Sequence, residues 1–220
     1  MTTAAVTGDM LAEFARVARC YSASAVFADV QGRAGVMHSS MKPTDREGVL
    51  VGRALTVQLS PGDLQDPLAA LDIVRAGDVP VVGAGGETET SVWGGLMGSL
   101  FKLKGSPGAV IDGACRDCDE NRDQGFRVFA RSVTPRGTHT MFSGRKDNIA
   151  LQVPVTCGGV LVRPGDVIVG DELGVTVIAS EHADETLRLA RDQAEREEAT
   201  REKIAAGWNV EQLLAEFGRL

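Results

Sequence analysis

One short segment, residues 110–117, places a cation and an anion side by side where a buried strand is expected to end. Its apolar first residues predict the strand, and the Asp112-Gly113 pair predicts the strand's end. Arg116 and Asp117 follow at once, and α/β proteins usually bind ligands beyond the carboxyl ends of their strands. Arginine holds a carboxylate through two hydrogen bonds, and aspartate offers hard oxygens to a divalent metal. The segment predicts a site for a small, anionic, oxygen-rich ligand held on a metal; two solvated charges on an exposed turn are the alternative.

A glycine-lined turn at Gly94-Gly95 is the second candidate element. Its bare backbone N–H groups can face a ligand, and a helix that starts there would turn its positive end toward a carboxylate. The glycines that begin at Gly83 do not match the dinucleotide-binding spacing, because Thr88 takes the last glycine position. Close packing against another backbone is the other explanation for the two adjacent glycines.

Composition excludes several classes of protein. The net charge of -7 and the lack of a basic stripe argue against nucleic-acid binding. The same charge repels anionic substrates at long range, so such a substrate requires a local cation or metal. No run approaches the roughly 20 apolar residues that span a bilayer. The amino-terminal residues do not resemble a signal peptide, and four cysteines are too few for a disulfide scaffold, so we expect a cytoplasmic protein without membrane contact.

Cysteines and histidines add little chemistry at this stage. Cys115 and Cys118 form a CxxC, but without a second CxxC or a histidine pair it does not predict a zinc site. We expect no redox role either, because the motif lacks the helix start that lowers a thiol pKa. None of the three histidines pairs with a serine or cysteine in a recognisable nucleophile motif. His139 is the one expected to border the site.

The order of elements predicts an α/β fold. Strands and helices alternate in the first half and short strands dominate the second, which favours a sandwich or swivelling domain over a regular doubly wound sheet. Helices are predicted over 9–20 (with Asp9 as its cap), 64–75 and 90–104, and strands over 52–59, 79–83, 109–112, 128–131, 153–162, 167–169 and 175–178.

We expect one domain over residues 1–220 that ends in a helical extension, about 183–220. A charge-rich helix is predicted over 183–206, and Gly207 ends it. An apolar stripe follows that is suited to packing on a partner subunit: Val210, Leu213, Leu214 and Phe217.

Several motifs, in their order and spacing, together resemble one family. They are Val36-Met37-His38, Val51-Gly52-Arg53-Ala54-Leu55-Thr56-Val57, Ala76-Gly77-Asp78-Val79, Val92-Trp93-Gly94-Gly95-Leu96-Met97, Val110 to Asp117, and Pro164-Gly165-Asp166-Val167. The chain resembles the RraA-like superfamily, which contains 4-hydroxy-4-methyl-2-oxoglutarate and 4-carboxy-4-hydroxy-2-oxoadipate aldolases and the protein inhibitor of ribonuclease E.

The resemblance implies a β/β/α swivelling-type fold, a homotrimer or homohexamer, and sites at subunit interfaces. In the aldolases the residue matching Asp117 holds Mg²⁺ (Mn²⁺ or another divalent cation is the alternative), and the one matching Arg116 grips the pyruvyl group. Backbone amides matching Gly94, Gly95, Leu96 and Met97 hold the substrate carboxylate. Catalytic roles therefore fall on Arg116 and Asp117.

The function that follows is a metal-dependent lyase of the class II aldolase type. It would release pyruvate from a pyruvyl-containing 2-oxo acid by retro-aldol cleavage, decarboxylate oxaloacetate, or do both. The aldolases carry an acid where this chain has Gly95, so we expect aldol cleavage to be weak relative to decarboxylation. An acid from Glu195, Glu197 or Glu198 of a neighbouring subunit is one substitute. A non-catalytic ring that binds another protein, as the ribonuclease E inhibitors do, is the alternative function.

Overall fold

A twisted sheet of eight strands forms the centre of the molecule. A computed structural model describes residues 6–45, 48–59, 67–138 and 150–218. The strand order is β1-β5-β4-β3-β2-β9-β10, and β6 pairs with β2; β7 and β8 form a separate hairpin. The strands are β1 (Lys42–Pro43), β2 (Leu50–Gln58), β3 (Asp78–Trp93), β4 (Gly108–Cys115), β5 (Arg127–Val133), β6 (Ala150–Leu151), β7 (Val155–Cys157), β8 (Val160–Val162), β9 (Val167–Asp171) and β10 (Gly174–Ile178).

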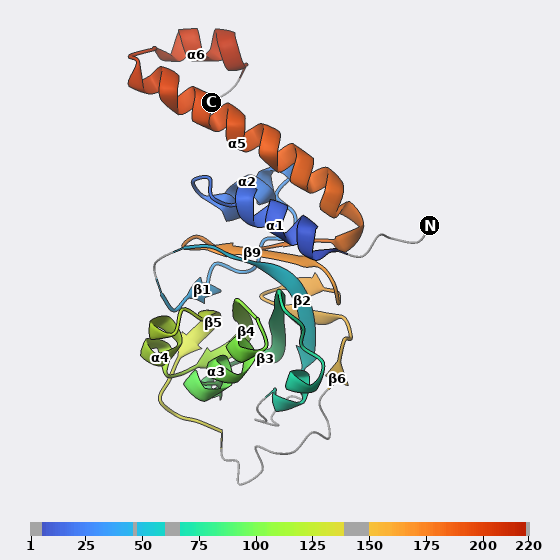
Figure 1. Cartoon of the computed structure of the whole chain (residues 1–220). Coiled ribbons are helices and arrows are strands. Elements are labelled where there is room, and N and C mark those ends of the chain that lie inside the picture. The colour runs from blue at the N-terminus through green and yellow to red at the C-terminus, as the bar shows by residue number, and fades with distance from the viewer. Residues whose placement is uncertain (1–5, 46–47, 60–66, 139–149, 219–220) are drawn as a thin grey trace.

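Helices lie in two groups around this sheet (Figure 1), and the α/β class is confirmed. One group lies over β9 and β10, and the other over the parallel strands β2 to β5. The first group holds α1 (Gly8–Val17), α2 (Ala23–Val30), η2 (Ser180–His182) and the beginning of α5 (Ala183–Ala205), and α6 (Val210–Phe217) follows α5 away from the sheet. The second group holds η1 (Leu68–Asp72), α3 (Gly95–Leu103) and α4 (Cys118–Asp123).

Strand β4 is covered on both faces, and all eight of its residues are buried. It lies between β3 and β5 and runs parallel to both. Ile111 packs with the core under α3, whereas its neighbour Val110 packs with the core on the opposite face. A parallel strand buried on both faces requires a nearly continuous apolar run, which is what made this strand predictable from the sequence.

Two predicted boundaries near the end of β4 were wrong. Asp112-Gly113 does not end the strand, because β4 continues to Cys115 opposite Trp93 of β3. Residues 90–93 are not helical: they extend β3 along β4, and the helix begins at Gly95. In both cases strand pairing overrides the local pattern, because tertiary contacts outweigh intrinsic preferences.

Two further predictions need correction. Thr7, not Asp9, caps α1, since its Oγ1 accepts a hydrogen bond from the Met10 amide at 3.2 Å. The helix expected over 64–75 is only the 3₁₀ helix Leu68–Asp72 in the part described, and residues 64–66 lie outside the described ranges.

An aromatic cluster fixes α3 against the sheet. The Trp93 ring lies 5.1 Å from the Phe101 ring and 5.9 Å from the Phe126 ring, measured between centroids. All three side chains are at most 1% exposed. Because Trp93 comes from β3 and Phe101 from α3, the cluster sets where the helix begins relative to the end of β4.

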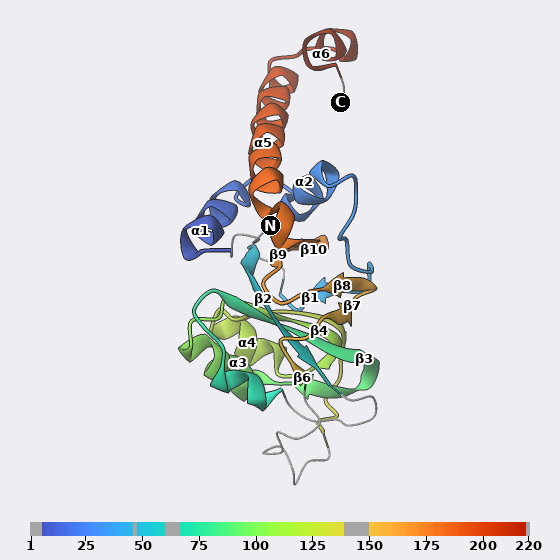
Figure 2. The same ribbon diagram turned by 90° about the vertical axis from the view of Figure 1, so that its right-hand side faces the viewer.

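Helix α5 leaves the sheet and carries α6 at its far end (Figures 1 and 2). Its first half buries Ala183, Leu187 and Ala190 in the core shared with α1 and α2. The predicted long helix is therefore confirmed, ending one residue before the predicted boundary. In the stretches that the structure describes, the helices all lack the combination of length and apolar character that crossing a membrane requires.

The aromatic cluster predicts a large difference between two positions of α3. Phe101→Ala removes a ring that is 0% exposed and should lower the free energy of unfolding by about 3–5 kcal/mol. Lys102→Ala, at an exposed side chain of the same helix, should change it by less than about 1 kcal/mol. Urea unfolding of both variants checks this, and equal losses would show that the cluster does not anchor α3.

Candidate active site

The turn after β4 meets the beginning of α3. Asp117 Oδ2 accepts a hydrogen bond from the Gly95 amide at 3.1 Å, and Arg116 Nε lies 3.5 Å from the same oxygen. Gly94 is the N-cap of α3 and offers no capping side chain. A Cβ at Gly94 would lie 2.8 Å from Asp117 Oδ2, so only glycine allows this approach. The two candidate elements of the sequence are therefore brought together.

Two helix amides remain free beside this turn. Within the described ranges, no hydrogen bond engages the amides of Leu96 and Met97, the second and third residues of α3. Unpaired amides at a helix amino terminus attract anions, because the helix dipole adds positive charge there. They border a cavity of about 200 Å³ whose other lining residues are Leu68, Ser91, Trp93, Gly94, Leu100, Arg116, Asp117 and Thr138.

The Arg116 guanidinium lies against the loop that follows β5. A Cβ on Gly137 would lie 3.0 Å from Arg116 Cζ, so the group packs over a bare glycine backbone. The Ser91 amide donates to the Arg136 carbonyl at 2.8 Å and holds this loop beside β3. With its side chain 47% exposed, Arg116 keeps donors available to a ligand in the cavity.

Asp117 has the features of a ligand for a hard cation. It adopts a left-handed backbone conformation (φ 53°), which turns the chain sharply between β4 and α4. Only Oδ2 takes part in the contacts above, and Oδ1 accepts no hydrogen bond from the residues described here. The side chain is 42% exposed, so its free oxygen is accessible from solvent.

Mg²⁺ fits this donor set better than Zn²⁺ does. Mg²⁺ is commonly held by one or two carboxylates and several waters, whereas structural zinc needs about four protein ligands. The described ranges contain no cluster of three or more histidine, cysteine, aspartate or glutamate side chains. Asp117 is therefore the residue that can hold a divalent cation beside Arg116.

One acidic residue beside the site, Glu120, was not predicted from the sequence. A Cβ built on Gly95 would overlap the Glu120 carboxylate and lie 2.9 Å from Glu120 Cβ. The glutamate thus fills the space that a side chain at position 95 would take. The sequence holds only a weak signal, that Glu120 follows Asp117 by three residues, because its position beside Gly95 depends on the packing of α4 on α3.

Within this chain the other acidic and histidine candidates lie elsewhere, and an acid from a neighbouring subunit stays a prediction. Glu197 and Glu198 pair with Arg201, and Glu195 lines a hollow between α1 and α5, away from α3. His38 lies 3.5 Å from Arg131 Nη2. His139 lies outside the described residues, and the structure does not place it.

The CxxC differs from the prediction. Cys118 is the first residue of α4, so the motif does have the helix start that was not expected from the sequence. The two sulfurs lie 3.9 Å apart. The hydrogen bond from Cys115 lowers the pKa of Cys118 to about 7, and the same hydrogen bond, with burial, raises the pKa of Cys115.

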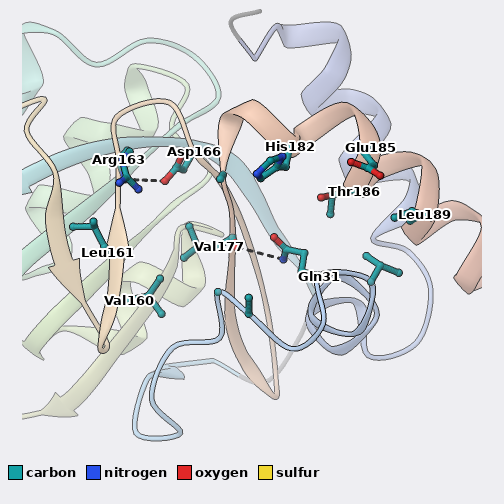
Figure 3. Close-up of a pocket in the computed structure, with 14 residues that line it drawn as sticks. Gln31, Val160, Leu161, Arg163, Asp166, Val177, His182, Glu185, Thr186 and Leu189 are labelled. Atoms are coloured by element: carbon teal, nitrogen blue, oxygen red, sulfur yellow. Dashed lines mark hydrogen bonds between the residues drawn. The ribbon is translucent and has the colours of Figure 1, made fainter. Parts of the chain in front are cut away.

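A larger cavity, of about 480 Å³, lies elsewhere, between α2, the β8 strand and the start of α5 (Figure 3). One of its two carboxylates, Asp166, accepts hydrogen bonds from the amides of Arg163 and Ser180, and the other, Glu185, lies on the first turn of α5. Burial raises the pKa of Asp166. Because these bonds serve the turn itself, we assign the chemistry to the smaller cavity beside Arg116.

Comparisons with known proteins show the family to which the chain belongs. A family model described as RraA-like (Aldolase/RraA) matches residues 3–177. A protein of Halalkalibacterium halodurans named "Putative 4-hydroxy-4-methyl-2-oxoglutarate aldolase" is 35% identical over 168 residues, which cover 76% of this chain and 77% of that one.

Two solved structures share the fold. An uncharacterised protein of Pseudomonas syringae pv. tomato superposes with a TM-score of 0.79 at 26% identity, covering 96% of this chain and 98% of the other. Streptomyces coelicolor RraAS2, described as an unusual member of the RNase ES inhibitor RraA family, gives a TM-score of 0.74 at 30% identity, covering 90% and 98%.

Proposed function

The chain belongs to the RraA-like family, and from this premise we propose that it is a divalent-metal-dependent lyase acting on 2-oxo acids that contain a pyruvyl group. The proposed reactions are retro-aldol cleavage that releases pyruvate and decarboxylation of oxaloacetate. One observation carries the proposal: Arg116, Asp117 and the free amides of α3 converge on one cavity. A protein-binding ring has no need for that combination.

Both reactions break a carbon–carbon bond next to a pyruvyl group and leave the enolate of pyruvate. The amides of Leu96 and Met97 bind the substrate carboxylate at the positive end of α3. The Arg116 guanidinium lies beside them and neutralises the charge that develops on the enolate oxygen. The Gly95 amide holds the Asp117 carboxylate in place through Oδ2, leaving Oδ1 for a divalent cation. When bound, that cation supplies Lewis acidity to the same enolate.

Aldol cleavage needs a base in addition, because a proton must leave the substrate's 4-hydroxyl group as the bond breaks. Glu120 is the carboxylate next to Gly95 in this chain, and we assign it this role. This assignment replaces the expectation that the glycine leaves the site without an acid. Decarboxylation needs no such proton transfer, so Glu120 serves only one of the two reactions.

A second candidate function is binding to another protein. The similarity to RraAS2 favours it, since that protein is described as belonging to an RNase inhibitor family. The two functions are separated by one assay: pyruvate release from oxaloacetate and from 4-hydroxy-4-methyl-2-oxoglutarate, with and without a chelator. Turnover that depends on the metal supports the lyase, and no turnover of either substrate would leave protein binding as the better proposal.

We further propose that the chain assembles as a homotrimer or homohexamer. Leu96, Leu100 and Leu103 form an exposed apolar row on α3, with exposed fractions of 76%, 44% and 84%. In the apolar stripe that follows Gly207, here called the carboxyl-terminal stripe, Leu213 is buried, whereas Val210 and Leu214 are exposed. Such surfaces favour association between copies.

The first prediction of this proposal concerns the metal ligand. Asp117→Asn keeps the shape of the side chain but weakens its hold on a cation, and should lower pyruvate release from oxaloacetate by about 10³-fold or more. Thermal unfolding should change little, because Asp117 is half exposed. Asp123→Asn, at a carboxylate 79% exposed on the same helix, is the matched control. Full turnover by Asp117→Asn, or by wild type in excess EDTA, would refute the metal mechanism.

The second prediction concerns the two reactions separately. Glu120→Gln should lower cleavage of 4-hydroxy-4-methyl-2-oxoglutarate by about 10²- to 10⁴-fold while oxaloacetate decarboxylation stays near the wild-type rate. Gly95→Asp should bring no gain in cleavage, because the new side chain collides with Glu120. Equal loss of both reactions in Glu120→Gln would contradict a role as base.

The third prediction concerns assembly. Light scattering at micromolar concentration should give the mass of three or six chains. The double variant Val210→Asp/Leu214→Asp puts two charges on the exposed part of the carboxyl-terminal stripe and should reduce that mass. A wild-type protein that is monomeric under these conditions would overturn the assembly.

A further inference from the structure

Two thiols flank the site residues. Cys115 is the last residue of β4 and is buried, and Cys118 is the first residue of α4 and is only partly buried. Their sulfurs lie 3.9 Å apart, and both are free thiols. Arg116 and Asp117 are the only residues between them.

We propose that Cys115 and Cys118 form a reversible disulfide that switches the adjacent site off. An S–S bond is about 2.05 Å long. Closing the pair therefore needs an approach of about 1.9 Å (3.9 Å less about 2.05 Å), a small movement for two side chains that already face each other. The effect on turnover rests on the proposed function, whereas formation of the disulfide does not.

The oxidant that we propose for this disulfide is a hydroperoxide. The Cys118 sulfur, which is the more exposed, attacks the peroxide oxygen; the O–O bond breaks, leaving a sulfenic acid on Cys118 and releasing an alcohol, or water from hydrogen peroxide. The Cys115 sulfur then attacks the Cys118 sulfur, the S–O bond breaks and a second molecule leaves as water. Two thiols are thus oxidised to one disulfide, and their two protons leave in the released molecules.

Disulfide formation should displace the residues between the two cysteines, because the segments on either side are held by hydrogen bonds. The Cys115 carbonyl accepts from the Thr134 amide at 3.0 Å, which fixes the end of β4. The Asn121 amide and side chain both donate to the Asp117 carbonyl at 3.1 Å, which fixes the first turn of α4.

The backbone of Asp117 is the part that can change, since its left-handed conformation (φ 53°) is one that residues other than glycine adopt at a cost in free energy. A change there withdraws the carboxylate from the Gly95 amide and from its position beside Arg116. The oxidised protein should therefore lose the arrangement that the cavity depends on.

Trypsin provides a direct test, because it cleaves after Arg116, between the two cysteines. The reduced protein gives separate peptides 105–116 and 117–122, whereas the disulfide joins them. Purified wild type is treated with hydrogen peroxide, remaining thiols are alkylated, and peptide masses and oxaloacetate turnover are measured before and after dithiothreitol. We expect the joined pair, at least tenfold lower turnover, and recovery of both with dithiothreitol.

Two variants sharpen the result. Cys118→Ser should give no joined pair and should keep its turnover after peroxide, while Cys20→Ser, on a half-buried thiol near α1, should behave as wild type. Failure to detect the joined peptides in wild type, or their formation without loss of turnover, would overturn the proposal. If reduced wild type shows no turnover at all, the proposed function fails and the peptide masses alone decide the disulfide.

Discussion

The hydrogen bond from the Gly95 amide to Asp117 Oδ2 is the contact on which the site depends. It joins the beginning of α3 to the turn after β4 and fixes a carboxylate next to a cation and two free amides. The contact requires a glycine at position 94, because a Cβ there would lie 2.8 Å from Asp117 Oδ2, whereas a Cβ at Gly95 would displace Glu120. The two glycines therefore leave the space that the Asp117 and Glu120 carboxylates occupy.

The fold supplies the rigidity that this contact needs. Strand β4 is buried along its whole length and delivers Arg116 and Asp117 to one edge of the sheet. The stacked rings of Trp93, Phe101 and Phe126 hold α3 against the same strands. A site placed at the ends of packed elements keeps its geometry better than a site on a free loop. The same arrangement makes the site sensitive to small changes between Cys115 and Cys118.

Patterns of apolar residues predicted much of the fold and of the site. The buried run before Asp112 predicted β4, and the glycine pair predicted a turn that faces a ligand, although the helix was predicted to begin at residue 90 and begins at Gly95. The extension of β3 to Trp93 escaped prediction because pairing with β4, not local preference, sets it. Glu120 escaped for a similar reason: its position beside Gly95 arises from the packing of α4 on α3, two helices that are distant along the chain.

Titration calorimetry with oxalate, a stable analogue of the pyruvate enolate, tests the central claim without relying on turnover. We expect oxalate to bind wild type in the presence of Mg²⁺ and far more weakly in excess EDTA. In Arg116→Ala/Asp117→Asn we expect weak binding that no longer depends on Mg²⁺. Oxalate binding of equal affinity with Mg²⁺ and with EDTA, or unchanged binding to the double variant, would contradict the claim.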